Sequence, residues 1–320
     1  MLIHFVRNGP SYLPELDAYA EFLQARGHQA LVHDHGHSVP SSAAVVWWMC
    51  GRVPHPEAHR LRQAFQVHEY ASASVPPHAW LKDCVKRWTQ PRPDFRIYQN
   101  GWVRERLGLE TGWMDQFHGR VPSALRDMGV APHFLEMASR HDLPAPEFDL
   151  VYLGEMSRLL PFVPLLHSIH AAGRRLLLVG EVPEALQALL PASVHCVGRV
   201  PHAQVPLQLR RARYGLNLVS HITPYNQQTS TKLLEYCAVG LPVVSNDYPW
   251  VRYFAAHHQA NFLLLRDDPQ SWETNFGEAL DAFPYQVPQV RSLAWPLVLD
   301  KLPLWQHLFG THPASGVQQS

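Results

Sequence analysis

The stretch T-S-T-K-L-L-E, residues 229–235, combines residue types that can bind an anion. Hydroxyl side chains are favoured at the N-cap of a helix, where the first backbone amides have no partner inside the helix. The hydroxyl residues here are Thr229, Ser230 and Thr231. Apolar residues then follow at the spacing of a core-facing helix. The sequence therefore predicts a helix that begins after this run and offers its first amides to a phosphate group.

Lys232 stands in the first turn of that helix, where the positive end of the helix dipole disfavours a cation. A bound anion would compensate for this placement. Glu235 lies three residues later and can face the same side of the helix. Gly240 ends the helix, and a buried strand follows from Leu241 through Pro242. An ordinary helix-to-strand turn without a ligand gives the same pattern, so this alternative stays open.

The composition narrows the class of protein. The chain has 320 residues, 27 basic and 27 acidic, and its formal net charge is 0. A chain that binds nucleic acid normally carries a basic excess, so nucleic acid is not expected as a partner. Hydrophobic residues make up 46% and charged residues 17%, which is typical of a globular protein. The four cysteines form no CxxC pair, which suits a reducing compartment.

The 21 histidines show no zinc-protease spacing, and the densest group is the segment 33–37, H-D-H-G-H. This segment could chelate a metal, but a solvated loop after a strand is the favoured interpretation. No pair of carboxylates resembles a DxD motif, so we expect no metal and no bound cofactor. The chain shows no signal peptide and no apolar run long enough to span a membrane, so we expect a cytoplasmic protein.

The first half of the chain alternates strands and helices. Strands are expected at 2–7, 28–34, 43–49 and 95–100, with helices at 13–25 and 102–107. This rhythm predicts a parallel sheet covered by helices. A loop and a short helix are expected over 119–130, and the proline-rich segment 141–146 is the best linker. Gly9 follows the first strand at its carboxyl end, where such sheets bind ligands.

A further strand is expected to deliver His68, Glu69 and Tyr70 into a loop rich in small hydroxyl residues. Hydrogen-bonding side chains at a strand end suit a polyol ligand, so a functional role is the favoured interpretation. The alternative is that the histidine and the glutamate cap the next element.

The segment 79–88, A-W-L-K-D-C-V-K-R-W, is basic and amphipathic. It could dock on anionic lipid. A surface helix that packs Trp80 and Trp88 inward is the favoured alternative.

The second half predicts strands at 148–153, 176–179, 194–197, 214–219 and 260–265. Helices are expected at 162–172 and 271–282, and an apolar helix over 293–308. Strand and loop signals that converge on one edge indicate a nucleotide-binding, Rossmann-like unit.

The pattern S-T-K-L-L-E-Y-C-A-V-G-L-P-V-V-S, residues 230–245, resembles the nucleotide-sugar-binding signature of GT-B glycosyltransferases, especially the family 4-like group. The resemblance implies an α/β fold of two Rossmann-like parallel-sheet domains that face a cleft. It implies an acceptor-side domain over 1–146, a nucleotide-sugar-binding domain over 147–290, and a terminal helix over 291–320 that crosses back to the first domain.

The resemblance also implies roles for individual residues. Ser230, Thr231 and Lys232 would hold the donor diphosphate, and Glu235 would bind the ribose. Gln227 occupies a position at which many members have a glutamate, so an amide would contact the donor sugar. Further donor contacts implied by the family are Gly9, Gly154, Arg199, Asn226 and Thr229. The implied catalytic set is His68, Glu69, Lys232 and Arg158, in which Arg158 counters phosphate charge.

The implied function is transfer of a sugar from a nucleotide-sugar donor, which is a co-substrate, to a hydroxyl acceptor. The family points to a surface polysaccharide or lipid-linked glycan as acceptor, to retention of the anomeric configuration, and to peripheral contact with the inner membrane surface. Two alternatives remain. A degenerate GT-B partner protein would bind nucleotide without turnover, and a nucleotide-sugar epimerase would use the same scaffold.

Overall fold

The computed structural model describes residues 1–7, 9, 13–49, 51–140, 142–266 and 276–310. The chain divides into two compact units. Unit 1 contains Met1–Met128 and the C-terminal segment that begins at Trp295, and unit 2 contains Gly129–Ala294. The first division therefore falls earlier than the expected boundary at 146. The reason is that α6 (Pro132–Met137), which precedes that boundary, packs against two helices of unit 2, α9 (Val205–Leu209) and α10 (Thr231–Ala238).

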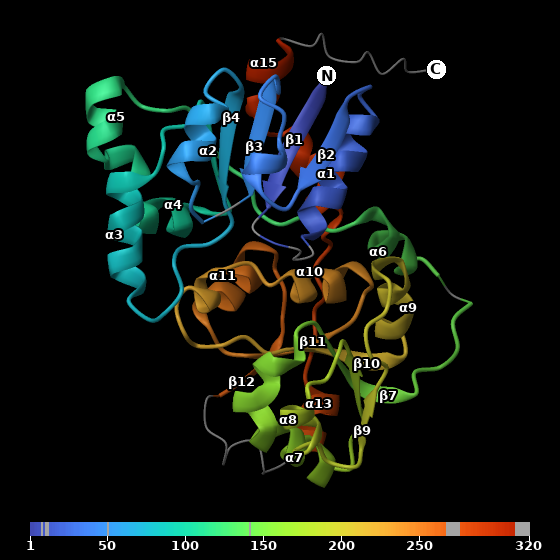
Figure 1. The fold of residues 1–320 in the computed structure, drawn as a ribbon. Helices are drawn as coiled ribbons and strands as arrows, with labels where there is room; N and C mark the ends of the chain where they lie inside the picture. The colour runs from blue at the N-terminus through green and yellow to red at the C-terminus, as the bar shows by residue number, and fades with distance from the viewer. Residues whose placement is uncertain (8, 10–12, 50, 141, 267–275, 311–320) are drawn as a thin grey trace, which may run out of the picture. The chain divides into compact units, whose positions relative to one another are not determined.

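Unit 1 is a parallel sheet of six described strands in the order β2-β1-β3-β4-β5-β6, with helices beside it (Figure 1). The strands are β1 (Leu2–Arg7), β2 (Gln29–His33), β3 (Val45–Met49), β4 (Phe65–Tyr70), β5 (Phe95–Tyr98) and β6 (Ser123–Leu125). The helices between them are α1 (Pro14–Gln24), α2 (His55–Arg60), α3 (Ala79–Thr89), α4 (Gly101–Leu107) and α5 (Trp113–His118). The predicted βαβ rhythm is confirmed.

Strand β3, V-V-W-W-M, is buried along its whole length, as expected for a central strand that helices cover on both faces. At the edge of the same sheet, the prediction of a loop and short helix over 119–130 is wrong. Ser123–Leu125 form β6, which pairs in parallel with β5, and the carbonyl of Pro122 accepts the amide of Arg96 at 2.9 Å. Pairing with β5 therefore outweighs the weak local signal of this three-residue strand.

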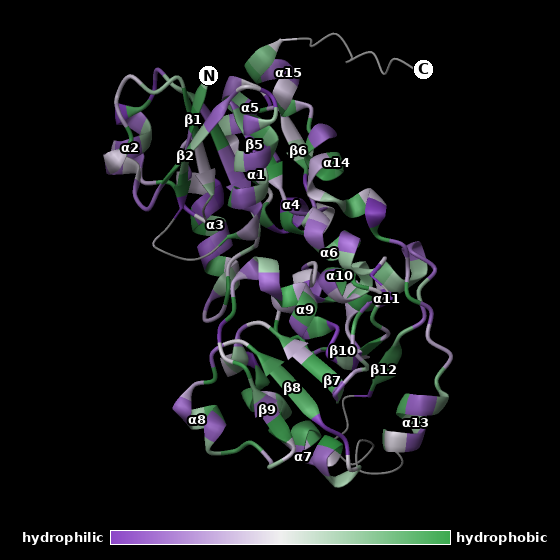
Figure 2. Cartoon of the chain, turned by 90° about the vertical axis from the view of Figure 1, so that its right-hand side faces the viewer, coloured by the Kyte–Doolittle hydropathy of each residue, from purple (hydrophilic) through white to green (hydrophobic). Residues whose placement is uncertain are grey.

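Unit 2 is a second parallel sheet of six described strands, in the order β12-β11-β10-β7-β8-β9. The strands are β7 (Phe148–Leu153), β8 (Leu176–Val179), β9 (Val194–Cys196), β10 (Ala212–Asn217), β11 (Val243–Asn246) and β12 (Leu263–Leu265). The remaining described helices of the unit are α7 (Val163–Ala171), α8 (Glu184–Gln187), α11 (Pro249–His257) and α13 (Phe276–Ala282). The strands β7 and β8 are mainly hydrophobic in Figure 2, and their residues form the core with α7. Part of the expected helix 271–282 lies outside the described residues.

Each sheet has one point at which the strand order reverses. In unit 1 this point lies between β1 and β3, and in unit 2 it lies between β7 and β10. Open α/β sheets bind ligands at the carboxyl ends of the two strands that flank such a point. The topology therefore predicts a ligand site at the carboxyl edge of each sheet, next to its reversal point.

The C-terminal segment of unit 1 forms two helices, α14 (Trp295–Asp300) and α15 (Leu304–Phe309). The prediction of one apolar helix over 293–308 is therefore wrong, because Pro303 interrupts it. Trp305 at the start of α15 packs on the core of unit 1. Its ring centroid lies 5.1 Å from that of Phe22 and 5.9 Å from that of Trp47.

The helix at 79–88 is confirmed as α3, but the inward packing of its tryptophans is wrong. Trp80 is 66% exposed and Trp88 is 61% exposed. The buried residue of α3 is Asp83, which accepts a hydrogen bond from the Ser74 amide at 2.9 Å and forms an ion pair with Arg106 at 3.2 Å. This polar anchor fixes the rotation of the helix and leaves its apolar residues outside.

Candidate functional site

Helix α10 begins where the hydroxyl run predicts. Ser230 is its N-cap, since its side chain accepts the Leu233 amide at 3.4 Å. The hydroxyl of Ser230 also donates to Oδ1 of Asn217 at 2.6 Å, at the end of β10. Because that hydroxyl is used inside the protein, Ser230 orients the turn. The amides of Thr231 and Lys232, which have no partner within a helix, are the groups that can meet an anion.

Tyr236 fixes the position of α10 on the sheet. Its ring lies over Gly215 of β10, where an added Cβ would come within 2.4 Å of the ring. The Tyr236 hydroxyl accepts the amide of Leu153 at 2.9 Å and donates to the carbonyl of Leu216 at 3.2 Å. These bonds tie α10 to the carboxyl ends of β7 and β10, the two strands at the reversal point of unit 2.

Lys232 lies at this point. Its ammonium group donates to the Tyr152 hydroxyl at 3.1 Å and to the Leu218 carbonyl at 3.0 Å, and it lies 4.3 Å from the centroid of the Tyr152 ring. Burial and, to a lesser extent, the positive charge of Arg158 lower the pKa of Lys232 to about 7, although Glu235 opposes the shift. Lys232 is therefore a cation without full compensation, which is the arrangement that an anionic ligand would stabilise.

Gly154 follows β7 and provides room beside Lys232. Its φ is +125°, and a Cβ there would lie 3.8 Å from Cε of the lysine. The neighbouring Gly180, at the end of β8, comes so close that a Cβ would lie 2.3 Å from the Gly154 carbonyl oxygen. Arg158 stands in the 3-10 helix Met156–Phe162, with its guanidinium 5.7 Å from the centroid of the Tyr225 ring. Gly154 therefore lies beside Lys232, and the charge of Arg158 acts on the Lys232 ammonium group.

Glu235 lies one turn along α10 and is paired with a residue that the sequence did not single out. Nε2 of His202 lies 3.4 Å from Oε1 of Glu235, whose side chain is 16% exposed. Burial raises the pKa of the Glu235 carboxyl, and the hydrogen bond with His202 opposes this shift. The His202 ring packs against Phe134 of α6 at 5.1 Å between centroids. His202 therefore orients the carboxylate expected to bind ribose.

The other predicted donor residues of unit 2 lie on loops. Asn226 stands in the 3-10 helix Tyr225–Gln227 and donates to the His221 carbonyl at 2.8 Å. Gln227 ends that short helix, and Thr229 directly precedes the N-cap. Arg199 is exposed and follows Gly198 beyond β9.

His68 does not reach out of a strand end into a loop, so that prediction is wrong for His68, whereas Glu69 lines a pocket at the carboxyl ends of β3 and β4. Both lie within β4, His68 1% exposed and Glu69 2% exposed. They point to opposite faces of the sheet because they are adjacent in a strand. Burial and, to a lesser extent, the nearby Arg96 lower the pKa of His68 to about 3. His68 is therefore a neutral core residue, bonded through Nδ1 to the Tyr70 hydroxyl at 3.2 Å.

Glu69 belongs to a buried polar network of unit 1. One carboxylate oxygen pairs with Arg126, and the other accepts the Tyr19 hydroxyl at 3.0 Å and the Trp47 indole N–H at 2.8 Å. Arg126 is 1% exposed. Both oxygens of Glu69 are thus engaged, which suits a structural role better than that of a base. The positive charge of Arg126 also acts on Glu15. Burial raises the pKa of the Glu15 carboxyl, and Arg126 opposes this shift.

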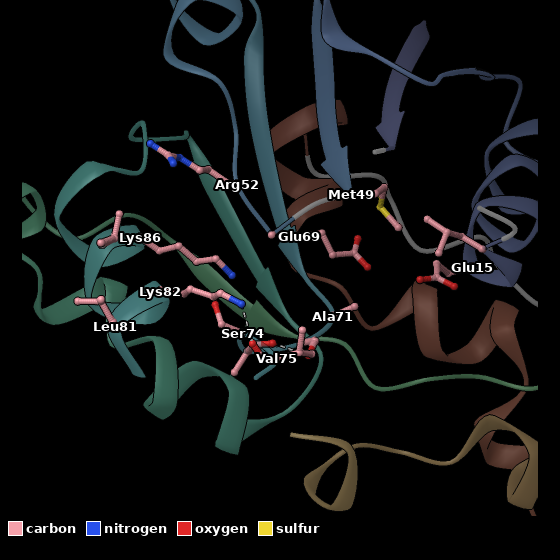
Figure 3. Close-up of a pocket in the computed structure, with 15 residues that line it drawn as sticks. Glu15, Met49, Arg52, Glu69, Ala71, Ser74, Val75, Leu81, Lys82 and Lys86 are labelled. Atoms are coloured by element: carbon pink, nitrogen blue, oxygen red, sulfur yellow. Dashed lines mark hydrogen bonds between the residues drawn. The ribbon is translucent and has the colours of Figure 1, made fainter. Parts of the chain in front are cut away.

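The network borders a pocket of unit 1, with a volume of about 670 Å³. The pocket lies beyond the carboxyl ends of β3 and β4 and against α3. Figure 3 shows Lys82 and Lys86 on one side of it, and Glu15 and Glu69 on the other. Sequence reasoning missed Glu15, because a glutamate in the first turn of a helix is ordinary. Gly9 follows β1 with a φ of +80°, and its amide donates to the Asp34 carbonyl at 3.3 Å.

The histidine segment 33–37 forms the end of β2 and a short 3-10 helix at Gly36–Ser38. Nε2 of His33 lies 2.9 Å from Nδ1 of His4. Within the described ranges, no group of three histidine, cysteine or acidic residues is placed to hold a metal ion. None of the described helices is long and apolar enough to cross a membrane.

Comparison with known proteins agrees with this geometry. Residues 147–282 match the family described as glycosyl transferases group 1. Among solved structures, AviGT4, a glycosyltransferase involved in avilamycin A biosynthesis, is 16% identical with a TM-score of 0.60 over 93% of this chain and 95% of its own. Sucrose-phosphate synthase from Thermosynechococcus elongatus is 13% identical with a TM-score of 0.62 over 96% and 99%.

HepE from Anabaena, solved in complex with UDP and glucose, is 11% identical with a TM-score of 0.58 over 88% of this chain and 90% of its own. At these identities the likeness concerns the fold, which is the two-domain GT-B arrangement. No curated protein matches the chain in sequence.

Proposed function

We propose that this protein, a GT-B glycosyltransferase whose residues 147–282 match the family described as glycosyl transferases group 1, transfers a sugar from a nucleoside-diphosphate sugar to a hydroxyl acceptor. The single observation that supports the donor site is Lys232. It lies at the N-terminus of α10, at the reversal point of the unit 2 sheet, with its pKa lowered by burial and by Arg158. HepE, which has been solved with UDP-glucose, has the same fold.

In the proposed reaction the donor diphosphate lies at the first turn of α10. As the bond between the sugar and the phosphate breaks, negative charge grows on the leaving diphosphate. The amides of Thr231 and Lys232, the Lys232 ammonium and the Arg158 guanidinium stabilise this charge, and Glu235 accepts hydrogen bonds from the ribose. These groups are already in place, so little reorganisation is needed.

We propose that the transfer proceeds with retention and that the leaving phosphate removes the acceptor proton. The engaged carboxylate of Glu69 supports this choice, because both of its oxygens already accept hydrogen bonds within unit 1. The unit 1 pocket is the proposed acceptor site, and a polysaccharide or lipid-linked glycan in the cytoplasm is the proposed acceptor. Anomeric analysis of the product tests this mechanism, and inversion at the anomeric carbon would contradict it.

Metal independence is also part of the proposal, since Lys232 and Arg158 supply positive charge on the protein side of the leaving group. Turnover is expected to persist in excess chelator. A strict requirement for a divalent cation would contradict this part of the proposal. It would not contradict the assigned donor site.

A screen of nucleoside diphosphates and nucleotide sugars by thermal shift, followed by assays of transfer and donor hydrolysis, tests the function. We expect a stabilising ligand whose effect is lost in Lys232→Ala and kept in the control Lys301→Ala, which alters an exposed lysine of unit 1. Stabilisation without turnover would favour the degenerate partner protein. Conversion of the donor sugar to its epimer would favour the epimerase.

A further inference from the structure

The unit 1 pocket has opposite charges on its two sides. Lys82 and Lys86 of α3 lie on one side, and Glu15 and Glu69 lie on the other (Figure 3). Apolar residues occupy much of the remaining lining, among them Leu13, Met49, Ala71, Ala73 and Val75. A ligand in this pocket therefore meets positive charge at one end and an acidic group at the other.

Glu15 is the acidic residue that is available to a ligand. Both oxygens of Glu69 are already engaged within unit 1. Glu15 is only 4% exposed, yet it lines the pocket. Its carboxylate takes a hydrogen bond from its own backbone amide, and none of the side chains that the structure describes donates another. A buried carboxylate with unused acceptor positions is stabilised by a ligand that supplies a donor.

The two lysines provide positive charge that is not fully balanced. The ammonium group of Lys82 donates to the neutral carbonyl of Val75 at 3.0 Å, and no described carboxylate forms an ion pair with it. Asp83, the acidic residue of the same helix, is paired with Arg106 instead. Lys86 reaches the pocket beside Gly51, where an added Cβ would lie 3.3 Å from its ammonium nitrogen. This side of the pocket suits a phosphate or carboxylate group.

The size and lining of the pocket restrict the ligand further. Its volume of about 670 Å³ lies within the range of small-molecule sites, about 300–1,000 Å³. A neutral sugar would leave the two lysines without an anionic partner, and a simple anion would give Glu15 no hydrogen bond. A sugar with an acidic substituent meets both requirements, and the carbon face of its ring suits the apolar lining.

We propose that the accepting sugar carries a phosphate or carboxylate group, which binds Lys82 and Lys86, and that one of its hydroxyls donates a hydrogen bond to Glu15. This assignment rests on the proposed function, because it takes the pocket as the acceptor site, and it narrows the acceptor to an anionic sugar. The lysines select the acceptor by its charge, and Glu15 fixes its orientation.

Equilibrium binding to the full chain in the absence of nucleotide tests the assignment. The probes are glucose, glucose 6-phosphate and glucuronate, and ligand-observed NMR measures their affinities. At least one charged sugar should bind about tenfold or more tightly than glucose, because hydrogen bonds to charged groups are the stronger ones. A preference for one of the two charged sugars identifies the anion as phosphate or carboxylate. Equal affinities for all three sugars would overturn the assignment.

The double substitution Lys82→Gln with Lys86→Gln should abolish the preference for the charged sugar and leave the affinity for glucose nearly unchanged. The matched control is Lys301→Gln, which alters an exposed lysine of unit 1 and should keep the preference. An undiminished preference in the double variant would overturn the assignment. A preference that Lys232→Ala abolishes would overturn it too, because the anion would then bind unit 2.

Glu15→Gln should have a different effect. It should weaken the binding of all three sugars by a similar factor and keep the preference for the charged one, because Glu15 meets a hydroxyl that they share. Unchanged affinities would contradict the role of Glu15. Circular dichroism establishes that each variant is folded, and the lysine substitutions test the anion site even where Glu15→Gln destabilises unit 1.

Transfer assays separate this assignment from the proposed function. Preferential binding of a charged sugar without transfer from any nucleotide sugar would contradict the proposed function and still support the anion site. Transfer to neutral acceptors, with no gain in rate for charged ones, would support the proposed function and overturn the assignment of an anionic acceptor.

Discussion

At the scale of single residues, the proposed chemistry of unit 2 depends most directly on Lys232. The same burial that lowers its pKa to about 7 removes water that would otherwise compete for a bound anion. The bonds to Tyr152 and to the Leu218 carbonyl hold the ammonium group at the start of α10. The free protein therefore keeps a titratable cation where the diphosphate is proposed to bind.

This arrangement predicts a pH-dependent affinity for nucleoside diphosphate. In the free protein Lys232 loses its proton as the pH rises through about 7. The bound diphosphate favours the charged form and raises the pKa, so binding takes up a proton above that pH. The affinity should fall with rising pH, by at most about tenfold per pH unit.

Calorimetric titrations in buffers of different ionisation enthalpy measure this proton uptake. Lys232→Met should bind more weakly and lose the excess pH dependence, while the titration of the ligand itself is common to both proteins. A wild-type affinity that follows the pH dependence of the variant would contradict the assigned role.

Unit 1 also contains a buried cation, Arg126, but the role of this residue is structural. It is fully buried, and the carboxylates of Glu69 and Glu15 both face its charge. Burial disfavours the charged guanidinium, but these carboxylates outweigh that effect and raise the pKa of Arg126. A buried cation of this kind is stable only while its partners remain.

Arg126→Met should lower the free energy of unfolding by about 3–5 kcal/mol, because two buried carboxyls lose their counter-charge. Urea unfolding followed by circular dichroism measures the change. The control Arg140→Met removes an arginine whose ion pair with Asp142 is exposed, and it should leave the midpoint almost unchanged. Equal effects of the two substitutions would show that the network contributes little.

At the scale of elements, the donor site depends on close contact between the loops that follow β7 and β8. Gly180 has a φ of +150°, and an added Cβ would meet the Gly154 carbonyl oxygen at 2.3 Å and Cε of Met156 at 2.7 Å. Only glycine fits here. A side chain would displace the loop that carries Gly154 and Arg158.

Gly180→Ala should therefore cost about 2–4 kcal/mol of stability and also weaken nucleotide binding. Gly173→Ala is the matched control, since Gly173 has a φ of +71° and open space around the position of a Cβ. The control should cost about 1 kcal/mol through backbone strain alone and leave binding intact. Thermal unfolding with and without nucleoside diphosphate separates the two effects. Similar losses of binding in both variants would contradict the proposed packing.

The elements also show what the sequence could predict. The start of α10 followed from local preferences, because the hydroxyl of Ser230 caps amides within its own turn. The role of β4 did not follow. Its polar residues resemble a strand end, yet Glu69 is satisfied by Arg126, which is 57 positions away in the chain. The hydrogen bond between Lys232 and Tyr152 could not be predicted for the same reason, since the two residues lie 80 positions apart in the chain.

At the scale of the whole molecule, unit 1 is built from both ends of the chain. Trp305 of α15 packs on Phe22 and Trp47, and the Arg126 guanidinium lies 5.3 Å from the centroid of the Trp295 ring. Unit 2, by contrast, is one continuous stretch, Gly129–Ala294.

Trp305→Ala should therefore loosen unit 1 selectively, because it removes aromatic surface from that core alone. Hydrogen exchange should accelerate in peptides from β1, β3 and α1 and remain unchanged in β7, β8 and β10. The control Trp88→Ala removes an exposed tryptophan and should change neither set. Equal acceleration in both units would show that their stabilities are coupled.

Unit 1 is formed by two separate parts of the chain, and this affects the order in which the units can fold during synthesis. A ribosome releases the six strands of that sheet long before it makes Trp295 and Trp305, whereas every residue of unit 2 is already present by then. The half of the protein translated first must wait for the last helices to close its core, so the intervening half can reach its native state earlier.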